Sequence, residues 1–488
     1  MAGPPAETKR YSLFDPTVRQ GHDPAGEIEW TFAISKHMYQ AGTVILPPLV
    51  RAARRPGTSL PPKTSDEEAG TGGDGGPPPS AVPIVIATLL RPVGPTGVQS
   101  HFGELDRFLR AQGVPSVVVT PFSAGGFGRN LVFGLRRVVE RLDRAMGVQW
   151  YVRFHTIYLE WALRQTLARL KDAVVYCQCP ASAMAALRAR RPGHRVVLAV
   201  HFFGSQADEW AMKGEINPGD LAFRSIRDTE RQAFAGVDGV VFVSDTARAG
   251  LWAELDPVVA TATIPNFVRS DLAVEGSAAA DLITIGALEP NKNHEFLLEV
   301  LAAAVKRGRH YTLDIAGEGP CHRGLERRAA SLGLDRQVRF LGHVPSAATT
   351  LAGYRAYVHA ARRESFGVAI LEAMTAGLPV LAPQVGAIPQ ILDDGVEGRT
   401  WELDEPDRAA DLLIELLDNE AARERMASAA RRRAVSTYSS DVVCPRLYAF
   451  LVSSHEDRGA HGARRAAGPT DGRSQEPAPP VLEKALSE

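Results

Sequence analysis

Residues 364–397 read ESFGVAILEAMTAGLPVLAPQVGAIPQILDDGVE, and the fold that we expect for the chain is built around this stretch. It begins with the carboxylate of Glu364, and a second carboxylate, Glu372, follows after seven intervening residues. Residues 365–367 predict the entry to a short helix, and the apolar residues after them predict that this helix continues through Met374.

The helix is expected to end sharply. Gly377 suits the left-handed backbone conformation that closes many helices, and Pro379 cannot continue a helix. Residues 379–383, PVLAP, form a short apolar run that is typical of a buried parallel strand. The stretch therefore predicts a helix followed by a parallel strand, as in an α/β domain.

The start of this helix is a candidate anion site. A turn of small residues that enters a helix leaves backbone N–H groups free, and the helix dipole favours an anion such as a diphosphate. Glu364 and Glu372, on either side, could accept hydrogen bonds from hydroxyl groups. Two such acceptors on either side of a phosphate site suit a sugar nucleotide, which has hydroxyls at both ends and phosphates between them. The alternative is a solvent-facing helix with two ordinary surface glutamates.

The stretch resembles the signature of the retaining glycosyltransferases of family 4, which have the GT-B fold and use nucleotide-sugar donors. The resemblance covers about residues 83–452. It implies an α/β chain with two Rossmann-like doubly wound domains facing a cleft. The residues that match the signature are Glu364, Phe366, Gly367, Glu372, Ala373, Gly377, Pro379, Gly386, Ile388 and Pro389.

The resemblance also implies roles for single residues of the stretch. Glu364 would contact the donor sugar, and Glu372 would contact the ribose. The backbone at Phe366 and Gly367 would meet the sugar and the phosphates, with Val368 beside them in the donor site.

Composition sets broad limits on what the chain does. Its 488 residues are enough for two substantial domains, and a net charge of -1 gives no reason to expect nucleic-acid binding. The N-terminus does not read as a secretory signal, and no apolar run is long enough to span a bilayer. Cys177 and Cys179 do not have metal-ligand spacing, so we expect small buried strand residues. These features favour a cytoplasmic protein, with peripheral contact to the inner face of a membrane as an option.

The chain divides into six expected parts. Residues 55–82 are rich in Pro, Gly and charge, and such a segment cannot bury a core. The parts are an N-terminal extension of unknown role (1–54), a flexible linker (55–82), an N-terminal Rossmann-like acceptor-binding domain (83–270), a C-terminal Rossmann-like nucleotide-sugar donor-binding domain (271–435), a helix crossing back to the first domain (436–453) and a disordered tail (454–488).

The first domain opens with a strand, a glycine loop, a helix and a second strand, which begin a doubly wound sheet. Gly97 in the loop either lets the backbone approach a ligand or serves a plain tight turn. The resemblance places this loop at the cleft and so favours a donor-binding Gly97. Residues 263–268, TIPNFV, resemble the short exit strand of this domain.

His201 follows the apolar run RVVLAV, at the carboxyl end of an expected parallel strand, where open α/β sheets bind ligands. A lone histidine is more often structural, but in similar enzymes a histidine here lies close to the donor sugar. We therefore expect His201 to be an active-site residue that positions donor or acceptor. Glu209 and Lys213 just beyond could contact the acceptor. Farther along, Ser244 and Asp245 are placed to cap a helix.

Residues 129–171 are rich in arginine and aromatic residues. A basic amphipathic helix lying on an anionic membrane is one interpretation, and a domain helix with a solvated basic face is the other. Some relatives use such a surface when the acceptor is linked to a lipid.

Lys292 lies in a turn between an expected strand and helix of the second domain. Its ammonium could neutralise a diphosphate and stabilise it as a leaving group, although an exposed lysine without function fits too. The chain departs from the family pattern twice. Ala287 stands five residues before Lys292 where an arginine is usual, so either another cation substitutes or donor binding is weaker. Gln390 replaces a common glutamate.

Gly317, Glu318 and Gly319 match a loop that packs near the nucleotide in similar enzymes. The backbone around His343 and Val344 would border the base. Together with His201, Lys292 and Glu364 as the catalytic set, these residues complete the expected site.

The sequence thus predicts a glycosyltransferase that moves a sugar from a nucleoside-diphosphate sugar to a glycan, a lipid-linked intermediate or a small molecule. A uridine donor is the default, with guanosine diphosphate mannose as runner-up, and no cofactor or obligatory metal is expected. A catalytically inactive scaffold, which Ala287 favours, and a nucleotide-sugar epimerase of the same fold are the competing hypotheses.

Overall fold

The structure is a computed structural model that describes residues 81–456 except 95, 126, 252–258, 271–279, 345–349 and 352. The predicted N-terminal extension, nearly all of the predicted linker and most of the predicted tail lie outside these residues. Two parallel sheets form the framework, each with six strands. Their strand orders are β2-β1-β3-β4-β5-β6 and β12-β11-β10-β7-β8-β9.

The strands of the first sheet alternate with helices, because parallel neighbours require a crossover connection. The strands are β1 (Ile84–Ala87), β2 (Ser116–Val119), β3 (Ala173–Cys177), β4 (His194–Val200), β5 (Gly239–Phe242) and β6 (Ala260–Thr263). The helices are α1 (Gly97–Ala111), η2 (Pro121–Ser123), α2 (Phe127–Leu142), α3 (Arg144–Leu167), α4 (Pro180–Ala189), α5 (Gln206–Met212), α6 (Leu221–Gly236) and α7 (Asp245–Leu251).

The second sheet is built in the same way. Its strands are β7 (Leu282–Ile285), β8 (Leu313–Ala316), β9 (Val338–Gly342), β10 (Ala356–Val358), β11 (Val380–Pro383) and β12 (Gly398–Trp401). Its helices are η4 (Pro290–Lys292), α8 (His294–Lys306), α9 (His322–Ser331), α11 (Val368–Thr375), α12 (Ile388–Ile391), α13 (Pro406–Asp418) and α14 (Glu420–Tyr438). A last helix, α15 (Ser440–Glu456), follows.

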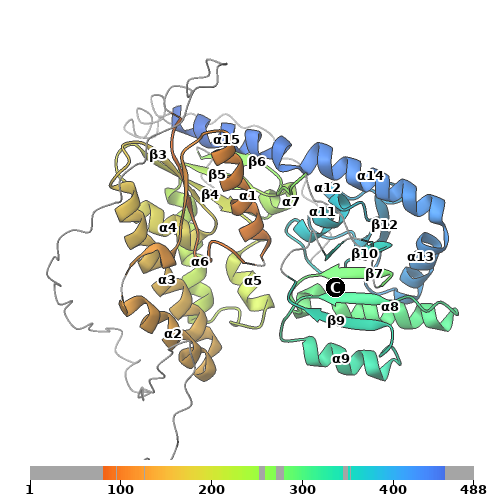
Figure 1. Cartoon of the computed structure of the whole chain (residues 1–488). Helices are drawn as coiled ribbons and strands as arrows, with labels where there is room; N and C mark the ends of the chain where they lie inside the picture. The colour runs from red at the N-terminus through yellow and green to blue at the C-terminus, as the bar shows by residue number, and fades with distance from the viewer. Residues whose placement is uncertain are drawn as a thin grey trace, which may run out of the picture. The chain divides into compact units, whose positions relative to one another are not determined.

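Both faces of each sheet are buried, as the near-continuous apolar strands predict. Alternate residues of β1 show this directly, because Val85 and Ala87 pack in one core and Ile84 and Ile86 in another on the opposite face. The second core also contains Leu447 and other α15 residues, so the C-terminal helix braces the first sheet, as predicted (Figure 1).

The predicted helix and strand of residues 364–383 are confirmed. The helix is α11, which begins at Val368, and the strand is β11, where residues 380–383 pair in parallel with β12 and residues 380–381 also pair in parallel with β10. Gly377 has a φ of 78°, which is the left-handed conformation that its position predicted. Ser244 caps α7, since its Oγ accepts from the N–H of Ala247 at 3.1 Å.

Two expectations need correction. The last strand of the first sheet is β6, so the predicted exit strand at 263–268 lies almost wholly beyond it. Cys177 is a buried strand residue as predicted, but Cys179 lies outside β3. It caps α4 instead, because its Sγ accepts from the N–H of Ser182 at 3.4 Å.

No helix among the described residues is both long and apolar enough to cross a membrane.

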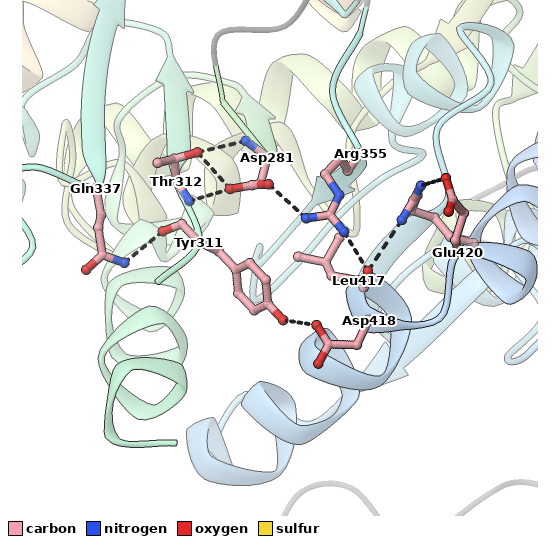
Figure 2. A network of polar contacts seen from close by, with 9 residues as sticks. Asp281, Tyr311, Thr312, Gln337, Arg355, Leu417, Asp418 and Glu420 are labelled. Carbon is pink, nitrogen blue, oxygen red and sulfur yellow. Dashed lines mark hydrogen bonds and ion pairs between the residues drawn. The ribbon is translucent and has the colours of Figure 1, made fainter. Parts of the chain in front are cut away.

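A polar network fastens β7 and β10 to the turn between α13 and α14 (Figure 2). The carboxylate of Asp281 accepts three bonds of 2.9 Å, from the N–H and Oγ1 of Thr312 and from Arg355. Arg355 also donates to the carbonyl of Leu417 at 2.6 Å. Burial alone would raise the pKa of Asp281, but the bonds from Thr312 and Arg355 outweigh it and lower that pKa.

We predict that Asp281→Asn lowers the free energy of unfolding by about 1–3 kcal/mol near pH 7, because Arg355 loses its charged partner. A carboxyl with a lowered pKa stabilises the fold above its unfolded pKa of about 4 and loses that effect as pH falls. The gap between wild type and variant should therefore narrow in acid. Urea titrations of wild type and variant, at pH 7 and at a pH below about 4, measure this difference in the free energy of unfolding.

Glu420→Gln is the matched control, since Glu420 is 76% exposed at the edge of the same network and pairs with Arg423 at 3.5 Å. This change should cost less than about 0.5 kcal/mol. Equal losses in the two variants would contradict a stabilising role for Asp281.

Candidate functional site

The loops that carry the predicted donor-site residues converge because their strands are neighbours. Lys292 lies beyond β7, Gly317 directly follows β8, and Glu364 lies beyond β10. The order β10-β7-β8 in a parallel sheet puts the carboxyl ends of these strands side by side. This edge is where open α/β sheets bind ligands.

Lys292 and Glu364 form the central contact of the site. The ammonium Nζ donates to Oε2 of Glu364 at 2.6 Å, and the two side chains are only 26% and 12% exposed. Burial alone would raise the pKa of Glu364, but the charge of Lys292 and the bonds from Lys292 and His359 lower it well below its usual range. Glu364 is therefore ionised at neutral pH and stays an acceptor.

His359 supports this carboxylate and was missed in the sequence. It lies 3.2 Å from Oε2 of Glu364 through Nε2, and burial lowers its pKa despite the neighbouring carboxylate. The neutral ring must donate from Nε2, because an ionised carboxylate can only accept. A usable signal was present, since His359 immediately follows β10 and precedes Glu364 by five residues.

The start of α11 has the free N–H groups that the sequence predicted. Gly367 is the N-cap residue with a φ of 97° and offers no side chain to the helix. The N–H groups of Ile370 and Leu371 bond back to Gly367, at 3.0 and 3.2 Å. Within the described part of the chain, those of Val368 and Ala369 meet no acceptor. The ring of Phe366 is buried in the core, so only its backbone can reach a ligand.

Gly97 lies against this helix from the first domain. It is the first residue of α1, and a β-carbon built on it would lie 3.2 Å from Cγ2 of Val368. The N-termini of α1 and α11 are thus neighbours, and both present the positive end of a helix dipole. Thr96 and Gln99 form a reciprocal cap on α1, which fixes the loop before it.

Glycine is required at Gly386 for close packing of the motif. A β-carbon there would overlap the carbonyl oxygen of Glu364, and the next residue, Ala387, donates its N–H to that oxygen at 3.2 Å. Two segments of the signature are thereby locked together behind the Lys292 contact.

The residues of the predicted nucleotide loop pack against the turn after β7. A β-carbon on Gly317 would overlap the carbonyl of Gly286, and one on Gly319 would overlap the backbone of Leu288. The carboxylate of Glu318 is exposed, while its carbonyl accepts from Leu288 at 2.9 Å. Val344, two residues beyond β9, is partly buried.

Glu372 lies inside α11, one helix turn beyond its start. Its side chain is partly buried and has no hydrogen-bond partner among the described residues. Burial raises the pKa of Glu372 to about 7. A carboxylate in this state needs hydroxyl or N–H donors from a ligand to offset the loss of water.

His201 follows β4 as predicted, but its observed contacts all lie within the first domain. Its Nε2 is 3.1 Å from Oε1 of Gln178, and its ring meets the ring of His101 edge-on at 4.8 Å. Burial lowers the pKa of His201 to about 4, so the ring is neutral at pH 7. Its Nδ1 has no partner in the described structure. His101, fully buried in α1, was not found from the sequence because an interior histidine carries no pattern.

The start of α7, with Ser244 directly before it, joins the two domains at the signature. Ser244 donates through Oγ to the carbonyl of Ser365, and Thr246 donates to that of Gly386, both at 3.1 Å. Gln390 donates to Oγ1 of Thr246 at 3.2 Å and accepts from the N–H of Asp245 at 3.4 Å. The amide in place of the usual glutamate therefore has a structural use.

The position of the missing arginine, Ala287, is exposed. A different cation, Arg362, donates to Oδ1 of Asn293, the residue directly after Lys292, at 3.0 Å. No cluster of three or more histidine, cysteine or acidic side chains suited to a metal ion occurs in the described ranges.

Comparison with known proteins matches both parts of the chain to families of one kind of enzyme. Residues 275–433 match the family model for group 1 glycosyl transferases, and residues 95–272 match that for glycosyltransferase family 4. The phosphatidyl-myo-inositol mannosyltransferase of Mycobacterium leprae is 28% identical over 379 residues, which are 74% of this chain and 94% of that enzyme.

Two further likenesses extend the picture. The phosphatidylinositol N-acetylglucosaminyltransferase of Arabidopsis thaliana has a chain that is 28% identical over 66% of this chain and 72% of its own length. The crystal structure of Anabaena HepE in complex with UDP and glucose aligns with a TM-score of 0.56 and 17% identity, over 77% of this chain and 100% of that one. The likeness to HepE establishes the fold. With a family model matched on each sheet, the chain belongs to the group 1 glycosyltransferases of the GT-B fold and is a transferase enzyme.

Proposed function

We propose that the protein transfers a glycosyl group from a nucleoside-diphosphate sugar to a hydroxyl of a lipid-linked acceptor, with retention at the anomeric carbon. The observation that carries this function is the Lys292–Glu364 pair beside the open N-terminus of α11. A cation and free N–H groups suit a diphosphate, while an ionised acceptor suits sugar hydroxyls.

The diphosphate would lie between Lys292 and the N–H groups of Val368 and Ala369. Lys292 supplies the positive charge that stabilises the departing diphosphate, and the helix end adds a fixed dipole. Arg362, which donates to the residue directly after Lys292, is a candidate substitute for the absent arginine. On this proposal a metal ion is not obligatory, since these groups supply the charge.

The two ends of the donor would be held by the two signature carboxylates. Glu364 accepts from hydroxyls of the sugar, and Glu372 accepts from hydroxyls of the ribose. The loop 317–319, with Glu318 at its tip, and Val344 would border the nucleotide. The neutral ring of His201 would position donor or acceptor from the first domain.

The reaction would proceed by displacement on one face of the sugar. The bond between the anomeric carbon and the diphosphate oxygen breaks, and the acceptor oxygen bonds to that carbon on the same face. The acceptor proton passes to the departing diphosphate. This route needs no enzyme nucleophile, and Glu364, tied to Lys292 and His359, is a poor candidate for one.

A uridine donor is favoured and guanosine diphosphate mannose is second. Support for uridine is the UDP bound in HepE, and support for mannose is the mannosyl transfer named for the Mycobacterium leprae enzyme. Calorimetric titration with uridine, guanosine and thymidine diphosphates identifies the base. If none binds at millimolar concentration, the inactive scaffold that Ala287 favours replaces the enzyme in this proposal.

Lys292→Met should weaken binding of the preferred nucleoside diphosphate about tenfold or more, because a charge-assisted contact to phosphate is lost. Turnover should fall about a hundredfold, as when one hydrogen-bond donor to the charge that develops in a transition state is removed. Calorimetry and donor-hydrolysis rates give the two numbers. Lys306→Met, an exposed lysine at the far end of α8, is the control and should change neither. Unaltered nucleotide affinity in Lys292→Met would rule out the phosphate role.

The affinity of the wild type for the same diphosphate should fall as pH drops from about 8 to about 6, because Glu372, whose pKa is about 7, loses the charge with which it accepts ribose hydroxyls. Glu372→Gln should bind more weakly at the higher pH and show little change over this range. Glu424→Gln, an exposed residue of α14, should behave as wild type. A flat wild-type profile would contradict the ribose assignment.

The lipid-linked acceptor is supported by the names of both relatives, which contain phosphatidylinositol. A second support lies in α2 and α3, which expose apolar side chains among arginines. Leu142 is 70%, Ile157 48% and Trp161 44% exposed. Arg153, Ile157 and Trp161 recur at intervals of four residues and so share one face of α3. Such a face suits the surface of an anionic membrane.

The full chain should therefore sediment with vesicles that contain anionic phospholipid, less so at high salt. The double variant Arg153→Glu, Trp161→Ser should reduce the bound fraction several-fold, since each basic residue near the surface contributes about 1 kcal/mol. Arg408→Glu removes a basic residue on α13 that is 72% exposed, and should bind as wild type. Equal binding of all three proteins would remove the membrane surface from this proposal.

A further inference from the structure

Helix α5 is fixed to the first domain by a fully buried carboxylate. Glu230, on α6, accepts from Oγ of Ser205 at 3.2 Å and from the N–H of Ala207 at 3.1 Å. Arg227 neutralises it at 2.9 Å, and the Glu230 side chain is 0% exposed. Burial raises the pKa of Glu230, while the bonds from Ala207, Arg227 and Ser205 act to lower it. These buried contacts fix the direction in which α5 presents its side chains.

One face of α5 points at the donor site. Met212, its last residue, receives a 3.4 Å hydrogen bond through Sδ from Arg363, the residue directly before Glu364. Glu209 is three positions earlier and therefore lies on the same face. Its carboxylate is partly buried and finds no hydrogen-bond donor among the described residues. It interacts electrostatically with Lys292, Glu364 and Glu289 of the second domain.

We infer that Glu209 binds the nucleophilic hydroxyl of the acceptor and holds it beside the anomeric carbon. The inference rests on the proposed function and extends it to the acceptor side of the same site. Two carboxylates of the second domain already serve the donor hydroxyls, and Glu209 comes from the first domain. An unpartnered carboxylate next to the Lys292–Glu364 pair can receive a hydroxyl proton in a hydrogen bond without displacing any protein contact.

The electrostatics of Glu209 fit this role. Burial raises its pKa to about 7, Lys213 on the same helix face and Lys292 lower it, and Glu364 and Glu289 raise it. The charged form, which accepts best, is thus lost as pH falls below about 7. Acceptor binding should weaken over the same range.

The test compares wild type, Glu209→Gln and Asp208→Asn, using the full chain, UDP-glucose or GDP-mannose as donor, and vesicles containing phosphatidylinositol. Asp208 is the exposed neighbour of Glu209 on α5 and serves as the control. For Glu209→Gln we expect KM for the acceptor to rise about tenfold or more, as for a lost charge-assisted hydrogen bond. KM for the donor, affinity for the nucleoside diphosphate and thermal midpoint should stay unchanged. The rise of acceptor KM below about pH 7 should be present in wild type and absent from Glu209→Gln.

The assignment of Glu209 is overturned if Glu209→Gln leaves the acceptor KM unchanged. It is also overturned if the variant loses donor affinity by the same factor as its acceptor KM rises. If wild type binds and hydrolyses the donor but transfers nothing to phosphatidylinositol, that acceptor fails and Glu209 is judged on hydrolysis, where water takes the acceptor position. Glu209→Gln should then hydrolyse the donor more slowly than Asp208→Asn, and equal rates overturn the inference. If wild type binds no nucleoside diphosphate, the proposed function fails, and the acceptor role of Glu209 falls with it.

Discussion

A buried carboxylate is costly unless a charge and hydrogen bonds compensate it, and Glu364 meets that requirement only in the folded chain. Its partner Lys292 is 72 residues away in the sequence, and both are brought together because β7 and β10 are neighbours. His359 completes the contact from the residue that directly follows β10. The sheet order, the glycine at Gly386 and the start of α11 all serve to hold this one pair beside free N–H groups. The same pair keeps Glu364 ionised, and so ready to accept from a ligand.

The contacts between the domains concentrate at the same signature. Ser244 and Thr246, at the start of α7, donate to the carbonyls of Ser365 and Gly386. Gln390 bonds to the same segment with both the NH₂ and the oxygen of its amide. Residues of the proposed donor site are therefore also those that touch the first domain. If the proposed function holds, a change in the signature alters both the donor contacts and the contacts between the domains, and a double-mutant comparison separates the two effects.

Residues whose role depends on local pattern were predictable from the sequence. Gly377, the strand after Pro379 and the helix start near Gly367 follow from backbone chemistry over a few residues, and the structure confirms them. His101 was missed because its role depends on burial and on a partner distant in sequence. His359 lies only five residues before its partner Glu364, so its local signal was present but not used. Glu209 carried a hint only as a polar residue after His201. Its distinguishing features, the anchor at Glu230 and the contact of Met212 with Arg363, are tertiary and leave no local trace.

The last helix has a consequence for the order in which the protein is made. Val443, Leu447 and Leu451 of α15 lie in the same apolar core as Ile84 of β1 and Leu105 of α1. The first sheet is synthesised early, yet the core on one of its two apolar faces, which α1 and α15 share, stays incomplete until the ribosome has completed the whole second sheet. The N-terminal domain, which usually folds first during synthesis, must here wait for the C-terminus of the described chain. During that interval the apolar surface that α15 later covers is of the kind that chaperones bind.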